Sequence, residues 1–278
     1  MRAWHLRRSH PMASSTSITC RGHWWVAAGV GLLLGSVAFA PARWAAQWID
    51  QATQGQVQLR NPHGSLWQGQ ADLLLRGGHG SQTELALPQG VQWQLRPGWA
   101  EGTAILRLHL LAPCCMAQPM PWQLYAGWSG AGVRMAAHRS QWPAGWLAGL
   151  GTPWNTIGLQ GQLVLDSPAL GLHWAQGRLR WSGGFTLDAL DLNSPLSTLQ
   201  PLGSYRVSFE GHQQQATPRL HLHTLHGDLT LKGEGQWSGS RFRFRGTAQA
   251  DPASVGAVSN LLNLLGRRDG LRAHISIG

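Results

Sequence analysis

The chain has 278 residues, of which 12% are charged and 43% are hydrophobic, with 36 glycines and 16 tryptophans. So few charged residues disfavour long salt-bridged helices, whereas the glycine and aromatic content favours β-strands. The formal net charge of +10 would suit a nucleic-acid partner, but the basic residues are scattered along the chain rather than gathered with stacking aromatic residues, so we expect no nucleic acid.

The first predicted element is the uncharged run over residues 24–40, which follows several arginines and no acidic residue. At about 1.5 Å per residue, a helix over this run and its neighbours spans about 30 Å, near the thickness of a bilayer core. The positive-inside rule places the arginine-rich end in the cytoplasm and the rest of the chain beyond the membrane. The run therefore predicts a single transmembrane helix. Its anchoring side chains are expected to be Trp24, Trp25, Leu32, Leu33, Leu34 and Phe39.

A cleaved signal peptide is the alternative for this run, because residues 38–40 fit the small-x-small pattern of a cleavage site. Pro41 directly after that site disfavours cleavage, and Trp44 and Trp48 lie where interfacial aromatic residues anchor a helix. We therefore favour a retained anchor. It divides the chain into a basic cytoplasmic tail over 1–21, a transmembrane helix with a juxtamembrane extension over 22–54, and a β-rich domain over 55–278.

The β-rich domain contains many short segments in which apolar and polar side chains alternate, separated by Gly, Pro or Ser. Such segments predict an antiparallel β-meander, so the fold class is mainly β with few short helices. The segments are residues 56–60, 71–76, 91–96, 104–110, 159–165, 177–181, 205–209 and 219–223. A Trp-x-Gly pattern recurs at Trp67, Trp128, Trp181 and Trp237, which is compatible with two similar halves and a break near 140–158.

The clearest local pattern is a hairpin over residues 228–250, in which alternation continues on both sides of Gly239 and Ser240. A two-residue turn there sets the register of the two strands. It is expected to place Trp237 opposite Phe242, Gly235 opposite Phe244 and Glu234 opposite Arg245.

Helix signals are few. Residues 47–53 are compatible with an extension of the membrane helix, and residues 142–150 with a short surface turn. The strongest signal starts at Asp251 as a cap, continues through Pro252 in the first turn and ends at Gly266. Its apolar residues repeat at heptad spacing, which predicts a helix packed over the end of the sheet, or else one that docks to a partner helix.

Candidates for chemistry are few. Cys114 and Cys115 are adjacent, and their short Cα separation favours two unbridged thiols over a vicinal disulfide or a metal site. Strand periodicity puts His221 and His223 on one face and His226 on the other, so a metal cluster would need a bulge.

Three carboxylates, Asp166, Asp188 and Asp191, could suggest paired catalytic acids, but loop and cap positions explain them equally well. No arrangement of residues reaches the level of an active site. We therefore expect no enzyme activity, no catalytic residue, no cofactor and no bound metal.

Several motifs occur in an order that resembles the protein N family of the bacterial type II secretion system. They are Phe39-Ala40-Pro41-Ala42-Arg43-Trp44, Gly64-Ser65-Leu66-Trp67-Gln68-Gly69-Gln70-Ala71, and the segments 195–196, 202–205, 224–229, 233–235 and 261–268. Each motif is weak alone, whereas the ordered set is moderately specific and covers nearly all of the chain after the basic tail.

The resemblance implies an accessory subunit in the inner membrane, with its bulk in the periplasm, that supports export of folded proteins across the outer membrane. Its partners would be other subunits of the secretion system, and exposed strand edges are also compatible with a homo-oligomer. Gly64, Leu66, Trp67 and Gly69 would be structural, because the glycines permit a turn and Trp67 fills the core.

A lipid or glycolipid carrier is the alternative function. In such a protein, an anchored meander curls into an open apolar groove that holds acyl chains. The carrier predicts an apolar trough that continues to the membrane, whereas the secretion subunit predicts a closed core with faces and edges available to partners.

Overall fold

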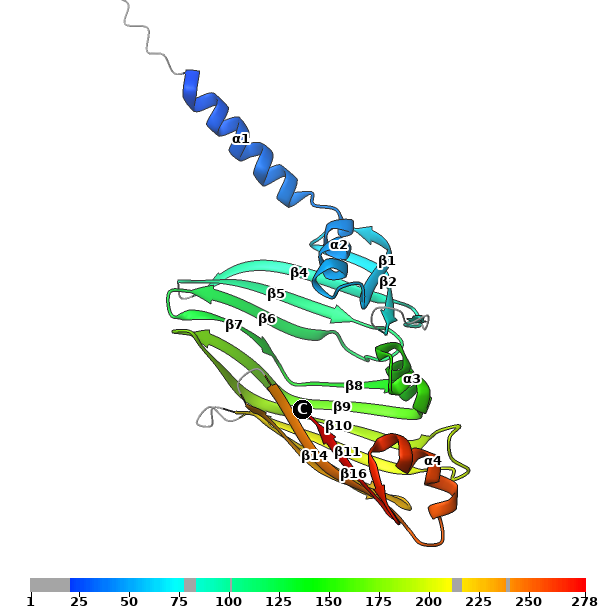
Figure 1. Ribbon diagram of the computed structural model, residues 1–278. Coiled ribbons are helices and arrows are strands. Elements are labelled where there is room, and N and C mark those ends of the chain that lie inside the picture. Colours follow the sequence, from blue (N-terminus) through cyan, green and yellow to red (C-terminus); the bar gives the residue numbers. More distant parts are fainter. Residues whose placement is uncertain (1–20, 78–83, 101, 212–216, 239–240) are drawn as a thin grey trace, which may run out of the picture. The chain divides into compact units, whose positions relative to one another are not determined.

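The computed structural model describes residues 21–77, 84–100, 102–211, 217–238 and 241–278 (Figure 1). The chain divides into two compact units, Met1–Ala40 and Pro41–Gly278. The predicted cytoplasmic tail over 1–21 lies outside the described residues, apart from its last residue. The other boundary, near residue 54, stays a prediction.

The first unit contains one described helix, α1 (Arg21–Ala38). The predicted anchor residues Trp25, Leu32, Leu33, Leu34 and Phe39 are all exposed. The side chain of Trp24 lies outside the described part of the structure. Judged by length and mean hydropathy, none of the helices in the described residues could span a membrane. The predicted transmembrane helix is therefore not confirmed.

The second unit begins with α2 (Ala42–Ala52), which is a separate helix rather than a continuation of α1. Almost all of the rest forms one sheet of sixteen strands. The strands are β1 (Val57–Gly64), β2 (Gln68–Arg76), β3 (Glu84–Ala86), β4 (Val91–Ala100), β5 (Thr103–Leu111), β6 (Met120–Gly127), β7 (Gly130–Met135), β8 (His138–Pro143), β9 (Gln160–Ala175), β10 (Arg178–Asn193), β11 (Gly203–Gly211), β12 (Arg219–His226), β13 (Leu229–Ser238), β14 (Arg241–Ala250), β15 (Arg267–Asp269) and β16 (Arg272–Ile277).

The predicted antiparallel meander is confirmed, because strand neighbours follow the chain order through most of the sheet. The long strand β9 pairs with β7 over one half and with β8 over the other, so that β7 and β8 act as two pieces of one neighbour. One sheet thus continues across the predicted break near 140–158. The similarity of the two halves stays a prediction.

Residues directly opposite one another on paired strands share a face of the sheet. Hydrophobic side chains predominate on one face, which we call the apolar face. Its side chains include Trp93, Leu110, Met120, Met135, Leu170, Trp181, Phe185, Phe209, Trp237 and Phe242. The opposite side, the polar face, carries Arg107, Gln123, Arg134, Arg206, His221 and Lys232.

α2 packs on the apolar face through Ala42, beside Trp93 and Leu110. The other helices of the second unit cover this face at one end of the strands (Figure 1). At this end lie the 3-10 helix η1 (Ala144–Leu150), α3 (Trp154–Ile157) and α4 (Val255–Leu265). From α4, Val258, Leu261 and Leu262 pack with Leu229 and Ala248 of the sheet. Separate core clusters lie around Leu163 and around the methionines of β6 and β7. The second unit thus builds its core at the helix-bearing end.

The predicted hairpin is confirmed in register: Trp237 lies opposite Phe242, Gly235 opposite Phe244 and Glu234 opposite Arg245. Its turn residues, 239–240, lie outside the described part. The helix near the C-terminus is also confirmed, but its predicted start is wrong. Asp251 accepts a hydrogen bond from the backbone N–H of Ala253 (3.0 Å), which closes a local turn, and regular helix begins at Val255.

Candidate interaction surfaces

The segment 64–69 connects β1 to β2 through a tight turn. Gly64 has φ +89° and a Cβ there would lie 2.5 Å from the carbonyl oxygen of Gln68, so the turn requires glycine. Ser65 closes the turn by donating its backbone N–H to that same carbonyl (2.8 Å). Ser65 also forms an isolated bridge with Pro41. The two N-terminal motifs that carried the family resemblance therefore meet in space.

The same turn encloses Trp93 of β4. The indole N–H of Trp93 donates to the Leu66 carbonyl (3.1 Å), and the Trp67 carbonyl accepts from the backbone N–H of Leu95 (2.6 Å). A Cβ on Gly69 would lie 2.5 Å from the Trp93 ring. Trp67 itself is half-buried, whereas Trp93 is only 7% exposed. The tryptophan that fills this core is therefore Trp93, which belongs to the alternating segment predicted as a strand but was not singled out.

The three carboxylates considered as paired acids face three different basic side chains. Asp188 accepts two hydrogen bonds from Arg206, at 2.6 and 2.7 Å. Asp166 lies 3.8 Å from Arg139, and Asp191 lies 3.5 Å from a ring nitrogen of His226. The Arg206 hydrogen bonds hold the pKa of Asp188 below its ordinary value, and partial burial opposes this shift. Asp188 and Arg206 thus form an ion pair on the polar face, and each of the three carboxylates contacts a basic residue rather than another carboxylate.

Replacing Asp188 by asparagine is expected to lower stability by about 1 kcal/mol at neutral pH. Because the pKa of Asp188 is lower in the folded chain than in the unfolded one, the pair stabilises the fold above the unfolded pKa. This contribution is lost as the pH falls through the lowered pKa. Urea denaturation of the unmodified protein and of Asp188→Asn at several acidic pH values should show a difference in unfolding free energy that disappears in strong acid. Asp166→Asn serves as the control, because the contact of Asp166 with Arg139 is longer and more exposed. An equal loss of stability in that variant would contradict this interpretation.

The histidines singled out in β12 do not converge. His221 lies opposite Glu234 and His223 opposite Lys232, on adjacent rungs of the polar face. His226 instead contacts the Ser204 hydroxyl, with 3.0 Å between Nε2 and Oγ. Basic side chains of this face form a row across the neighbouring strands that we call the basic row. It consists of Arg206, His223, Lys232, His274 and Arg267, with Thr247 of β14 between Lys232 and His274. Four of these side chains are exposed, whereas Arg206 is half-buried and paired with Asp188.

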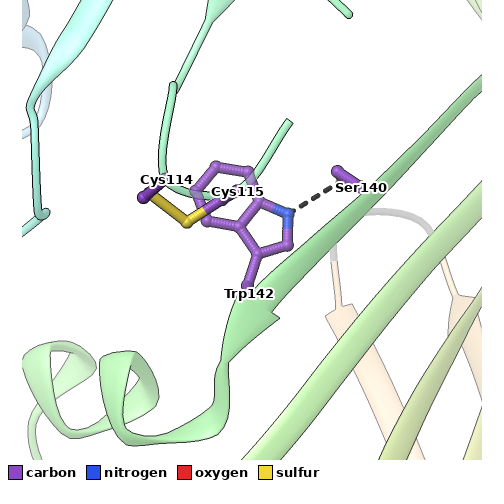
Figure 2. Close-up of a disulfide and its surroundings, with 4 residues drawn as sticks. All are labelled: Cys114, Cys115, Ser140 and Trp142. Atoms are coloured by element: carbon purple, nitrogen blue, oxygen red, sulfur yellow. Dashed lines mark hydrogen bonds between the residues drawn. A yellow bond between two sulfur atoms is a disulfide. The ribbon is translucent and has the colours of Figure 1, made fainter. Parts of the chain in front are cut away.

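The expectation of two unbridged thiols is wrong, because Cys114 and Cys115 form a vicinal disulfide (Figure 2). The pair lies in the loop between β5 and β6, where Cys115 is buried and its carbonyl accepts a hydrogen bond from the backbone N–H of Gln141 (2.8 Å). The indole of Trp142 packs against the same cluster and donates to Ser140 (2.9 Å). Sequence spacing alone could not reveal that this loop is folded against β8.

A family model described as type II secretion system (T2SS), protein N, matches residues 55–274. The match covers nearly all of the second unit. Comparisons with curated proteins and with solved structures gave no significant match. The family resemblance that the motif order indicated is confirmed.

Proposed function

The chain belongs to the type II secretion system protein N family, and we propose that it serves as an accessory subunit that supports export of folded proteins through contacts with other subunits. The observation that carries this proposal is the family match over residues 55–274. The family is a structural or accessory component of secretion and is not known as an enzyme.

We further propose that the first unit attaches the chain to the inner membrane, with the second unit in the periplasm. Residues 24–40 carry no charged side chain, and the apolar side chains of α1 from Leu32 to Leu34 are exposed. Exposed leucines in an uncharged segment are stable when lipid covers them. Alkaline extraction of membranes from cells that make the full chain tests this. A chain released into the soluble fraction, or a mature N-terminus at Pro41, would contradict it.

The contact with partner subunits is proposed to lie on the polar face. Both edge strands discourage edge pairing, since β15 has three exposed charged residues and β1 contains Pro62 and a break in register after Arg60. The basic row instead presents the exposed cations Lys232 and Arg267, with two exposed histidines, on the polar face, which suits an acidic partner surface.

The test is complementation of a strain that lacks the gene, with secreted enzyme in the medium as the readout. The full chain should restore secretion and co-purify with other secretion subunits in mild detergent. Lys232→Glu, within the basic row, should reduce co-purification and secretion. Arg107→Glu is the matched control, because it reverses an exposed charge on the polar face of β5. Equal losses would argue against the basic row, and full secretion without the gene would contradict the function itself.

The lipid-carrier alternative predicted an apolar trough. The hollows formed by the described residues include one on the polar face, lined by His221, Lys232 and Arg245 among others. Lipid that co-purifies with the chain in the absence of secretion subunits would favour the carrier.

A further inference from the structure

We propose that the end of the sheet opposite the helices docks onto the surface of an anionic phospholipid bilayer. Successive hairpins of an antiparallel sheet turn at alternate ends, so every second connection lies at the same end. The strand ends that face one another in β4–β5, β6–β7 and β9–β10 lie together at the end of the sheet away from α3 and α4 (Figure 1). Together with the ends of β11–β12 and β13–β14, we call this region the hairpin end.

Large apolar side chains are exposed at the hairpin end. Trp99, beside the turn of β4–β5, is 73% exposed, and Trp174, beside the turn of β9–β10, is 54% exposed. Trp128 lies in the turn of β6–β7 and is fully exposed. Leu124 and Leu179 are exposed on the neighbouring strands. Monomeric proteins seldom leave so many large apolar groups uncovered in one region, so this surface marks a binding site.

Two of these side chains, Trp99 and Trp174, stand on strands of the sheet rather than in loops. Trp99 lies opposite Ala104, and Trp174 opposite Leu179, on the apolar face. Further along the same face, rings of Trp181 and Phe209 lie edge to face, with centroids 5.3 Å apart. Among the described helices, η1, α3 and α4 lie at the other end, and α2 packs beside Trp93, Leu95 and Leu108. Trp99 and Trp174 are therefore held by the sheet, Trp128 projects from a turn, and all three are exposed.

Arginines surround the apolar tips. The exposed arginines of the hairpin end are Arg96, Arg178, Arg180, Arg219, Arg241 and Arg243. They lie on the polar face of their strands, one residue removed from the apolar side chains, as Arg178 and Arg180 flank Leu179. Glu210 lies directly opposite Arg219, and Glu101 directly follows β4 in the sequence. Among the described residues, none of the six arginines forms an ion pair. Arginines therefore outnumber carboxylates at the hairpin end.

A bilayer fits this combination better than a protein surface does. Tryptophan is favoured at the boundary between headgroups and acyl chains. Each arginine near an anionic membrane contributes about 1 kcal/mol. The tips protrude separately from several hairpins, which lie two or more strands apart at about 4.8 Å per strand. A bilayer surface is wide and deformable, with negatively charged headgroups over an apolar interior, so it contacts all of these groups at once. A protein partner would need a matching pocket for each protruding indole.

The test is vesicle flotation with the full chain held in an amphipathic polymer, so that its N-terminal apolar segment is already covered. Vesicles of phosphatidylcholine with phosphatidylglycerol should bind the chain, and vesicles of phosphatidylcholine alone should bind it weakly. A triple variant, Trp99→Ser, Trp128→Ser and Trp174→Ser, should lose at least about tenfold in partitioning. Trp154→Ser is the matched control, because it removes an exposed tryptophan at the helix-bearing end.

Circular dichroism and thermal unfolding verify that the variants are folded. A second measurement avoids tryptophan removal: an environment-sensitive dye on Trp128→Cys, in a Cys20→Ser background, should show an apolar shift with anionic vesicles, whereas the same dye on Thr247→Cys of the polar face should not. Equal binding to both vesicle types, or undiminished binding of a folded triple variant, would overturn the proposal. If the triple variant no longer co-purifies with secretion subunits but still binds vesicles, the hairpin end contacts a protein partner instead. That result would also overturn the proposal. The proposal is independent of the secretion function, which the complementation test addresses.

Discussion

Leu262→Ala is expected to lower the free energy of unfolding of the second unit by about 3 kcal/mol. Leu262 is 0% exposed and belongs to the cluster that joins α4 to β13, β14 and β16. Truncation to alanine removes buried methyl groups and leaves a cavity between a helix and a sheet that collapse only partly. Because Leu262 lies between α4 and the sheet, the substitution weakens the contact that holds α4 on the apolar face.

Urea denaturation followed by circular dichroism measures this change. Leu264→Ala provides the matched control, since Leu264 lies on the same helix but is 40% exposed. The control should change stability by less than about 1 kcal/mol. If both variants lose the same stability, α4 does not pack through Leu262, and the docking role of this helix is contradicted.

Local alternation proved a reliable guide to the strands of this chain. The hairpin of β13 and β14 could be predicted residue by residue, because the side-chain period of a strand is two and a short turn fixes the register. The apolar residues of α4 were predicted for the same kind of reason, since Val258 and Leu262 repeat at helical spacing. The start of α4 was not, because a local side-chain hydrogen bond at Asp251 competes with the helix.

Features that depend on contacts between distant residues could not be predicted in this way. Trp93 is buried by a turn about two dozen residues earlier in the chain, and nothing in its own strand marks it as the centre of that contact. The loop that carries the bridged Cys114 and Cys115 folds against β8, through a hydrogen bond from the Gln141 N–H to the Cys115 carbonyl. The hairpin end emerges only when the strand order places separate turns at one end of the sheet. In each case the missing information is tertiary.

Gly69→Val is expected to destabilise the second unit by about 3 kcal/mol. A Cβ at this position would lie 2.5 Å from the Trp93 ring and 2.7 Å from the backbone carbonyl oxygen of His63. The ring could move only by giving up its hydrogen bond to Leu66, and the carbonyl is held in β1. The substitution therefore forces either the indole or the strand out of place, and with it the turn that joins the two N-terminal family motifs.

Thermal and urea unfolding of Gly69→Val measure this effect, with Gly256→Ala as the control, because a Cβ at Gly256 of α4 meets nothing within 4 Å. The control should be neutral or stabilise the chain by up to about 1 kcal/mol. A double-mutant cycle of Gly69→Ala with Trp93→Leu separates the two contacts. If the indole is the main obstacle, the cost of Gly69→Ala should shrink in the Trp93→Leu background. An unchanged cost would assign the requirement for glycine to the His63 carbonyl, and no cost in either background would contradict the close approach of β2 to Trp93.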